Sequence, residues 1–196
     1  MRLSSLFLVV LALLTATVAI AQTNVRVRGT IVAVDGNVMA VKSRHGRDLK
    51  LQLPDNVSVA VAKAVRFEDL KEGDYVGVTT VAAPDGALTA VEVHYLAPTV
   101  PDGHIAWDLQ PNSMMTNANV RSVVKAVDKR EITVQYKDGS KRILVPENAP
   151  IVRAVPGTRA DLTPGEYIFA GATQAADGTL TAPRIQVSKE GVRPPQ

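Results

Sequence analysis

The sequence predicts an all-β protein that contains two tandem small OB-like Greek-key β-barrels related by internal duplication. Short runs of alternating apolar and polar residues are broken by Gly, Asp and Asn about every 8–12 residues, which is typical of all-β folds. The same turn motifs also occur twice, 92 residues apart: Asp-Leu-x-x-Gly at residues 69–73 and 161–165, and Asp-Gly-x-Leu-Thr-Ala at 85–90 and 177–182. A pair of open β-sandwiches is the alternative architecture.

Residues 1–21 are expected to be a cleaved signal peptide. Arg2 provides the positive first region, Leu6 to Leu14 the apolar stretch, and Ala19-Ile20-Ala21 a small-x-small cleavage site. An uncleaved N-terminal anchor is the alternative. The sequence beyond residue 21 has no apolar run near the ~20 residues of a membrane helix, so we expect no further span and a periplasmic or secreted location. Without cysteine, the chain has neither disulfides nor thiolate metal ligands.

The first repeat is expected at residues 24–96 and contains five strands. Alternation begins at Val25, and Asp35-Gly36-Asn37 forms a hairpin turn because Gly and Asn tolerate positive φ. Leu49, Leu51 and Leu53 are spaced to share one face of a strand. The other strands of this repeat are expected at residues 38–42, 75–81 and 88–95.

The second repeat, residues 119–189, follows the same plan. Its strands are expected at residues 120–127, 131–136, 141–145, 167–172 and 180–187. Between the third and fourth strands of each repeat, the Asp-Leu-x-x-Gly motif predicts one helical turn. Its Leu70 or Leu162 would plug the barrel, and Gly73 or Gly165 would permit a left-handed exit. Residues 97–118 are expected to be a proline-containing linker, and residues 190–196 a disordered tail.

The segment Gly29-Thr30-Ile31-Val32-Ala33-Val34-Asp35-Gly36, followed by Asp69 to Asp74, resembles a family of exported bacterial small β-barrel domains of unknown function, commonly found in tandem. The resemblance extends over both repeats, about three quarters of the chain. It implies the barrel fold and says almost nothing about activity, because its motifs are turn formers and core apolar residues.

The function predicted from the sequence is that of a non-enzymatic, exported binding or scaffolding protein, whose partner is an envelope protein or a glycan. The linker contains the only tryptophan, so Trp107, Asp108, Met114 and Met115 form the expected contact surface. The alternative for these residues is simple packing between the barrels.

A second hypothesis is a periplasmic metal-handling accessory that binds copper or zinc. Imidazole and thioether groups suit copper, and His94, His104, Met114 and Met115 would be the ligands. No close ligand spacing such as His-x-x-x-His is present.

Catalysis and nucleic-acid binding are not predicted. The repeated Asp69 and Asp161 are expected to cap helical turns rather than to act as acid and base, and no nucleophile motif occurs. Lys42, Arg44, Arg47 and Lys50 form a basic hairpin. However, the net charge is only +3 and aromatic residues make up 4% of the chain, whereas single-strand binding requires stacking platforms.

Overall fold

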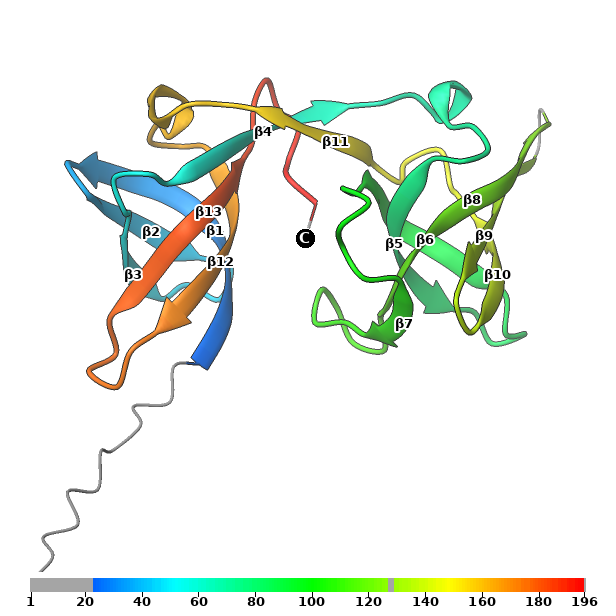
Figure 1. Cartoon of the computed structure of the whole chain (residues 1–196), viewed down its shortest axis with the longest axis horizontal. Coiled ribbons are helices and arrows are strands. Elements are labelled where there is room, and N and C mark those ends of the chain that lie inside the picture. Colours follow the sequence, from blue (N-terminus) through cyan, green and yellow to red (C-terminus); the bar gives the residue numbers. More distant parts are fainter. Residues whose placement is uncertain (1–22, 127–128, 196) are drawn as a thin grey trace, which may run out of the picture.

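The computed structural model describes residues 23–126 and 129–195, and within them the protein is all-β. Figure 1 shows two lobes side by side, joined by two long arms that cross above the space between them. The strands are β1 (Thr23–Asp35), β2 (Val38–Ser43), β3 (Asp48–Gln52), β4 (Ser58–Ala64), β5 (Tyr75–Ala82), β6 (Leu88–Tyr95), β7 (Gly103–Ala106), β8 (Met114–Ala126), β9 (Lys129–Tyr136), β10 (Gly139–Leu144), β11 (Ile151–Pro156), β12 (Tyr167–Gln174) and β13 (Leu180–Val187). Two 3-10 turns are present, η1 (Phe67–Asp69) and η2 (Arg159–Asp161).

All thirteen strands belong to one continuous sheet, which closes on itself twice. In the first lobe, β3, β2, β1, β12 and β13 are paired in this order, and β13 also pairs with β3. In the second lobe, β10, β9, β8, β5 and β6 are paired in this order, and β10 also pairs with β6. Each lobe is therefore a ring of five strands, and β7 adds to the edge of the second ring through β8.

The strand partners contradict the expectation that residues 24–96 and 119–189 form one barrel each. The first lobe takes three strands from the first repeat and β12 and β13 from the second, while the second lobe takes β5 and β6 from the first repeat. The reason lies in the two arms. β4 leaves the first lobe beside β13, pairs with the antiparallel β11, and carries the chain into the second lobe (Figure 1). β11 makes the reverse journey, starting beside β6.

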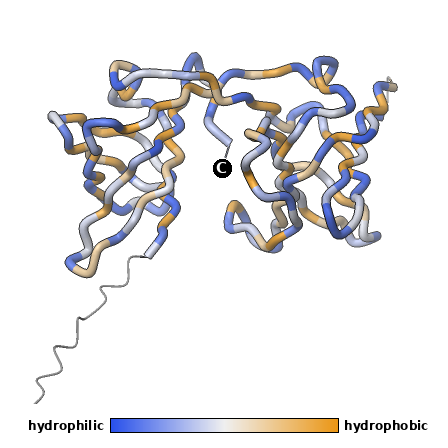
Figure 2. The backbone as a smooth tube through the Cα atoms, in the orientation of Figure 1, coloured by the Kyte–Doolittle hydropathy of each residue, from blue (hydrophilic) through white to orange (hydrophobic). Residues whose placement is uncertain are grey.

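Each lobe has its own apolar core, as the alternation of residue types along the strands requires. Figure 2 shows apolar and polar residues alternating along the tube in both lobes. Leu162 packs in the core of the first lobe and Leu70 in that of the second, and both are almost completely buried. Both side chains follow the predicted helical turns. Gly73 and Gly165 have φ of 88° and 92°, which confirms the predicted left-handed exits.

Several predictions for the remaining segments change. Residues 97–118 are not a structureless linker, because they contain β7 and the start of β8. The tail is not disordered as far as residue 195, because Lys189 and Val192 form a β-bridge and Pro194 and Pro195 are buried. The predicted signal peptide lies outside the described residues. Within the described part of the chain, no helix is long and apolar enough to cross a membrane.

Candidate functional site: the cleft between the lobes

Each lobe has one sheet face whose residues correspond in position to those of the other lobe. The strand register identifies these corresponding positions. Directly opposite residues in an antiparallel ladder point to the same side of the sheet. In the first lobe, Arg28 lies opposite Phe169, and Phe169 lies opposite Gln186. At the corresponding place in the second lobe, Asn117 lies opposite Gly77, and Gly77 lies opposite His94. Two residues along each strand, on the same face, the corresponding rows are Arg26, Gly171 and Arg184 in the first lobe and Met115, Thr79 and Glu92 in the second.

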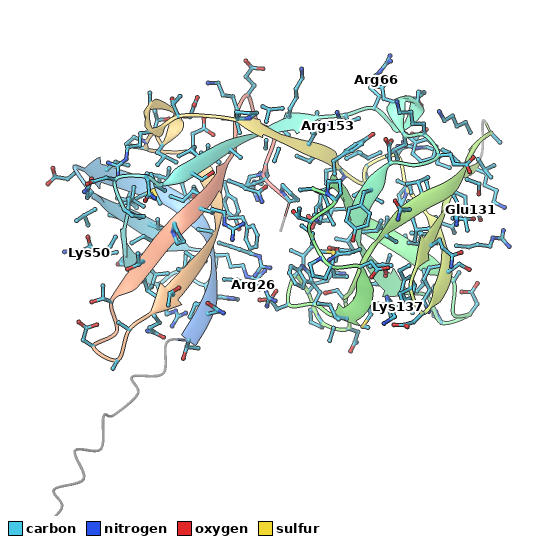
Figure 3. All side chains as sticks on the ribbon, viewed as in Figure 1. Arg26, Lys50, Arg66, Glu131, Lys137 and Arg153 are labelled. Carbon is cyan, nitrogen blue, oxygen red and sulfur yellow. The ribbon has the colours of Figure 1, made fainter. Side chains whose placement is uncertain are left out.

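The face of the first lobe is cationic. The Arg28 guanidinium lies 5.1 Å from the centre of the Phe169 ring, and Arg28 is 4% exposed. Arg26 is more open, and its guanidinium lies 4.2 Å from the centre of the Trp107 ring. Figure 3 shows Arg26 extending from the first lobe toward the second. This face therefore points into the cleft.

The face of the second lobe is uncharged or anionic at the matched positions, and it is buried. Thr79 donates a hydrogen bond to Glu92 Oε1 at 3.1 Å, and its Oγ1 lies 3.9 Å from the Met115 sulfur. Glu92 and His94 are 5% and 9% exposed. The two lobes have the same strand plan, but they present different chemistry across the cleft.

The His94 ring lies directly on Gly77. A Cβ built at Gly77 would be 2.5 Å from His94 Nε2, so only glycine leaves room for the imidazole. His94 Nδ1 makes no hydrogen bond, and Glu92 Oε1 is 3.9 Å away. Burial lowers the pKa of His94 from 6.5 to about 4, because the charged imidazolium loses hydration. His94 is therefore neutral at pH 7.

A hairpin from the second lobe reaches across the cleft and binds the first. Its strands are β7 and the start of β8, and residues 107–113 form its tip. Asp108 accepts two hydrogen bonds from the Arg28 guanidinium, at 3.0 and 2.8 Å. Arg44 donates to the main-chain oxygens of Asp108 and Leu109, at 2.6 and 3.1 Å. We call this contact the clasp. The Arg28 guanidinium holds the pKa of Asp108 below its usual range.

The clasp changes the role predicted for the contact surface. Trp107 and Asp108 do lie in the cleft, but their side chains bind Arg26 and Arg28 of the same chain. Met115 is buried and Met114 half-buried on β8. All four residues thus have contacts within the chain, while Asp108 is still 47% exposed, and the contact surface for a partner stays a prediction.

The proposed metal ligands do not come together, and strand register gives the reason. Met114 and Met115 are consecutive in β8 and point to opposite faces of the sheet. His104 lies opposite Thr116, and its Nδ1 is 2.8 Å from Thr116 Oγ1, so it shares the face of Met114. His94 shares the face of Met115. The set of four ligands is therefore wrong as a single site, and the described residues contain no group of three or more His, Cys, Asp or Glu side chains able to hold a metal ion.

The repeated aspartates differ in what they bind. Asp161 Oδ2 accepts hydrogen bonds from the Thr158 main-chain N–H at 2.8 Å and from the Thr158 hydroxyl at 3.2 Å. Asp161 therefore takes part in capping η2, although it is the last residue of the turn and the N-cap is Thr158. Asp69 instead binds the Arg66 guanidinium, at 2.9 and 3.2 Å, and η1 has no side-chain cap. For Asp69 the capping prediction is wrong.

A cavity of about 870 Å³ opens beside the second-lobe face. Its lining includes the arms β4 and β11, β6 with Glu92, the hairpin tip with Leu109 and Gln110, and residues 191–195 of the tail. Residues 65–68, Arg130 of β9 and residues 147–150 complete the lining. The tail, the tip of the hairpin that makes the clasp, and Glu92 therefore line the same cavity. This cavity is the candidate binding site.

Arg26, Arg28 and Glu92 were not among the predicted site residues. No sequence signal pointed to Arg28, because alignment of the two repeats places it opposite Arg121, an identical residue. Only the strand register matches Arg28 with Asn117.

No family model, no curated protein and no solved structure matches this chain. The site must therefore be interpreted from its geometry.

Proposed function

We propose that the protein is a non-enzymatic, exported binding module whose ligand occupies the cleft between two OB-like barrels related by duplication. The five-strand rings support the barrel assignment, since each strand pairs with two neighbours and a helical turn precedes the fourth strand of each ring. The order of elements from β1 to β6 recurs from β8 to β13, in agreement with the sequence repeat. Export rests on the N-terminal sequence pattern.

The cavity of about 870 Å³ is the observation that carries this proposal. Ligand sites in proteins usually have volumes of about 300–1,000 Å³ and occur between domains. The lining combines apolar side chains such as Phe67 and Ile151 with a few charged ones such as Glu92 and Arg130. Such a surface suits a ligand that is partly apolar and partly polar, for example a segment of an envelope protein.

The test is photo-crosslinking in the cells that make the protein. A benzoylphenylalanine at Gln110, which is exposed and lines the cavity, should form a covalent adduct. The same group at Asp138, in the exposed turn between β9 and β10, is the matched control and should form none. Val91→Trp narrows the cavity wall and should remove the Gln110 adduct. Equal adducts at both positions, no adduct at Gln110, or an adduct unaffected by Val91→Trp would contradict the proposal.

The metal hypothesis now rests on fewer groups. His94 and Glu92 share one face, with Met115 beside them, whereas structural and catalytic zinc sites use three or four protein ligands. Native mass spectrometry of the full chain, purified without chelators, tests it. The mass of the bare chain supports the binding module, and an added copper or zinc mass that His94→Gln removes would favour metal handling.

A further inference from the structure

The tail of the chain enters the cleft by a tight turn. After β13, Lys189 and Val192 exchange main-chain hydrogen bonds of 3.1 and 2.9 Å. The two residues between them, Glu190 and Gly191, have φ of 52° and 79°. Positive φ at both central positions is the mark of a type I′ turn, which reverses a chain within two residues. Figure 1 shows the tail running back from this turn into the space between the lobes.

The residues after the turn are seated rather than free. The Arg193 guanidinium lies 4.7 Å from the centre of the Tyr167 ring, a cation–π contact with the first strand of the neighbouring hairpin. Pro194 and Pro195 are buried, and both line the cavity. Because proline has no main-chain N–H, two consecutive prolines can be buried without leaving an amide donor unpaired.

The cavity is not filled by this segment. About 870 Å³ stays open beside residues 191–195, along a wall that includes Val91, Glu92 and Leu109. Proline-rich segments are stiff, so they lose little conformational entropy when they dock in such a groove. The cleft therefore has the space and the lining for a longer extended segment of the same kind.

We propose that the cleft is a binding groove for extended Arg-Pro-Pro-type polypeptide segments, and that residues 191–195 occupy part of it in cis. This inference rests on the proposed function and names its ligand class. The resident tail competes with an incoming segment, because both need the site of Pro194 and Pro195. Tight binding then requires displacement of the tail. The apparent affinity equals the intrinsic affinity multiplied by the fraction of time that the site is free of the tail.

The experiment uses a fluorescently labelled peptide with the sequence of residues 191–196, Gly-Val-Arg-Pro-Pro-Gln, and fluorescence anisotropy. The full chain with Pro194→Asp and Pro195→Asp, which expels the tail, should bind this peptide about tenfold more tightly than the unmodified chain. The control peptide Gly-Val-Arg-Ala-Ala-Gln should bind more weakly to the same variant. A chain that stops after Glu190 provides a second variant in case the two aspartates disturb folding.

Saturable binding of the proline peptide with these differences supports the proposal. Equal affinity of the variant and the unmodified chain, or no preference over the alanine peptide, would overturn it, provided that the variant melts cooperatively. A concentration-dependent dimer that Pro194→Asp removes would also overturn it, because the tail would then bind a second copy. If the peptide fails while the Gln110 adduct persists, only the ligand class falls; if the adduct is absent as well, the proposed function falls too.

Discussion

The two lobes have similar apolar cores and similar turns, but they differ in the residues by which they face each other. At matched positions of strand register, Arg28 of the first lobe corresponds to Asn117 of the second, and Gln186 corresponds to His94. The core next to these positions stays apolar in both lobes. The comparison teaches that the fold constrains one face of the sheet, while the other face is free to acquire specific contacts. Those contacts are the clasp on the first lobe and the buried pair of Glu92 and His94 on the second.

The largest expected effect concerns a buried position at which the two lobes have different residues. Gly29 and Ala118 are matched by register, since they lie opposite Ile168 and Val76. A Cβ at Gly29 would collide with the main-chain oxygen of Lys42 and lie 2.8 Å from Ser43 Cα. We expect Gly29→Ala to lower the free energy of unfolding by about 3 kcal/mol, measured by urea denaturation.

The matched control is Ala118→Gly. It adds no atom, and its cost should be only about 1 kcal/mol. If Gly29→Ala cost no more than this control, the close approach of β1 and β2 at that point would be contradicted.

The next effect depends on pH and concerns only the second lobe. The pKa of His94 is about 4 in the folded protein, against an ordinary value of 6.5. Between these values the unfolded chain binds a proton at His94 that the folded chain does not. The free energy of unfolding should therefore fall as the pH falls from 6.5 to 4, by about 3 kcal/mol in total.

Substitution of His94 by glutamine, the residue at the matched position 186, should flatten this part of the pH profile. The measurement is denaturant unfolding at a series of pH values for both proteins. The same slope in both would show that other groups, such as the neighbouring carboxylate of Glu92, cause the dependence.

The third prediction tests how much the clasp, which only the first lobe binds, contributes to stability. Asp108→Ala leaves the Arg28 guanidinium, whose side chain is 2% exposed, without its carboxylate partner. Because Asp108 itself is 47% exposed, solvent screens part of the interaction, and we expect a loss of about 2 kcal/mol in the free energy of unfolding.

Arg28→Asn, which copies the second lobe, should make a further Asp108→Ala substitution nearly neutral. A double-mutant cycle by denaturant unfolding measures this coupling. Additive effects of the two substitutions would contradict the clasp as an energetic link.

The smallest effect compares the two repeated aspartates. Asp161→Ala removes the acceptor of two hydrogen bonds from Thr158 and the partner of Lys189, whereas Asp69→Ala removes only an exposed pair with Arg66. Thermal melts should show a clear decrease in Tm for Asp161→Ala and almost none for Asp69→Ala. A larger decrease for Asp69→Ala would reverse the assigned roles.

Much of the local structure could be predicted from the sequence. The positions of most strands, the two helical turns and the buried Leu70 and Leu162 depend on alternation and turn chemistry, which are properties of neighbouring residues. The arms were missed. β4 and β11 lie in segments interpreted as connections, although Ser58–Ala64 contains alternating valines, and these arms decide which strands meet.

The candidate site, too, could be predicted only in part from the sequence. Trp107 and Asp108 could be selected from sequence because they stand in the segment between the two repeats, which has no repeated counterpart. Their use as a clasp depends on Arg26 and Arg28, which are about 80 residues away in the chain. No periodicity connects residues at that separation.

By itself, the sequence determined the all-β class, the turn positions and the apolar face of each strand, because φ preferences and side-chain alternation act over a few residues. Only the tertiary structure decided that each lobe combines strands from both halves, that His94 and His104 lie on opposite faces, and that the tail enters the cleft. Main-chain hydrogen bonds between strands are the same for every residue type except proline, so the choice of partner depends on how the arms and cores pack together in space.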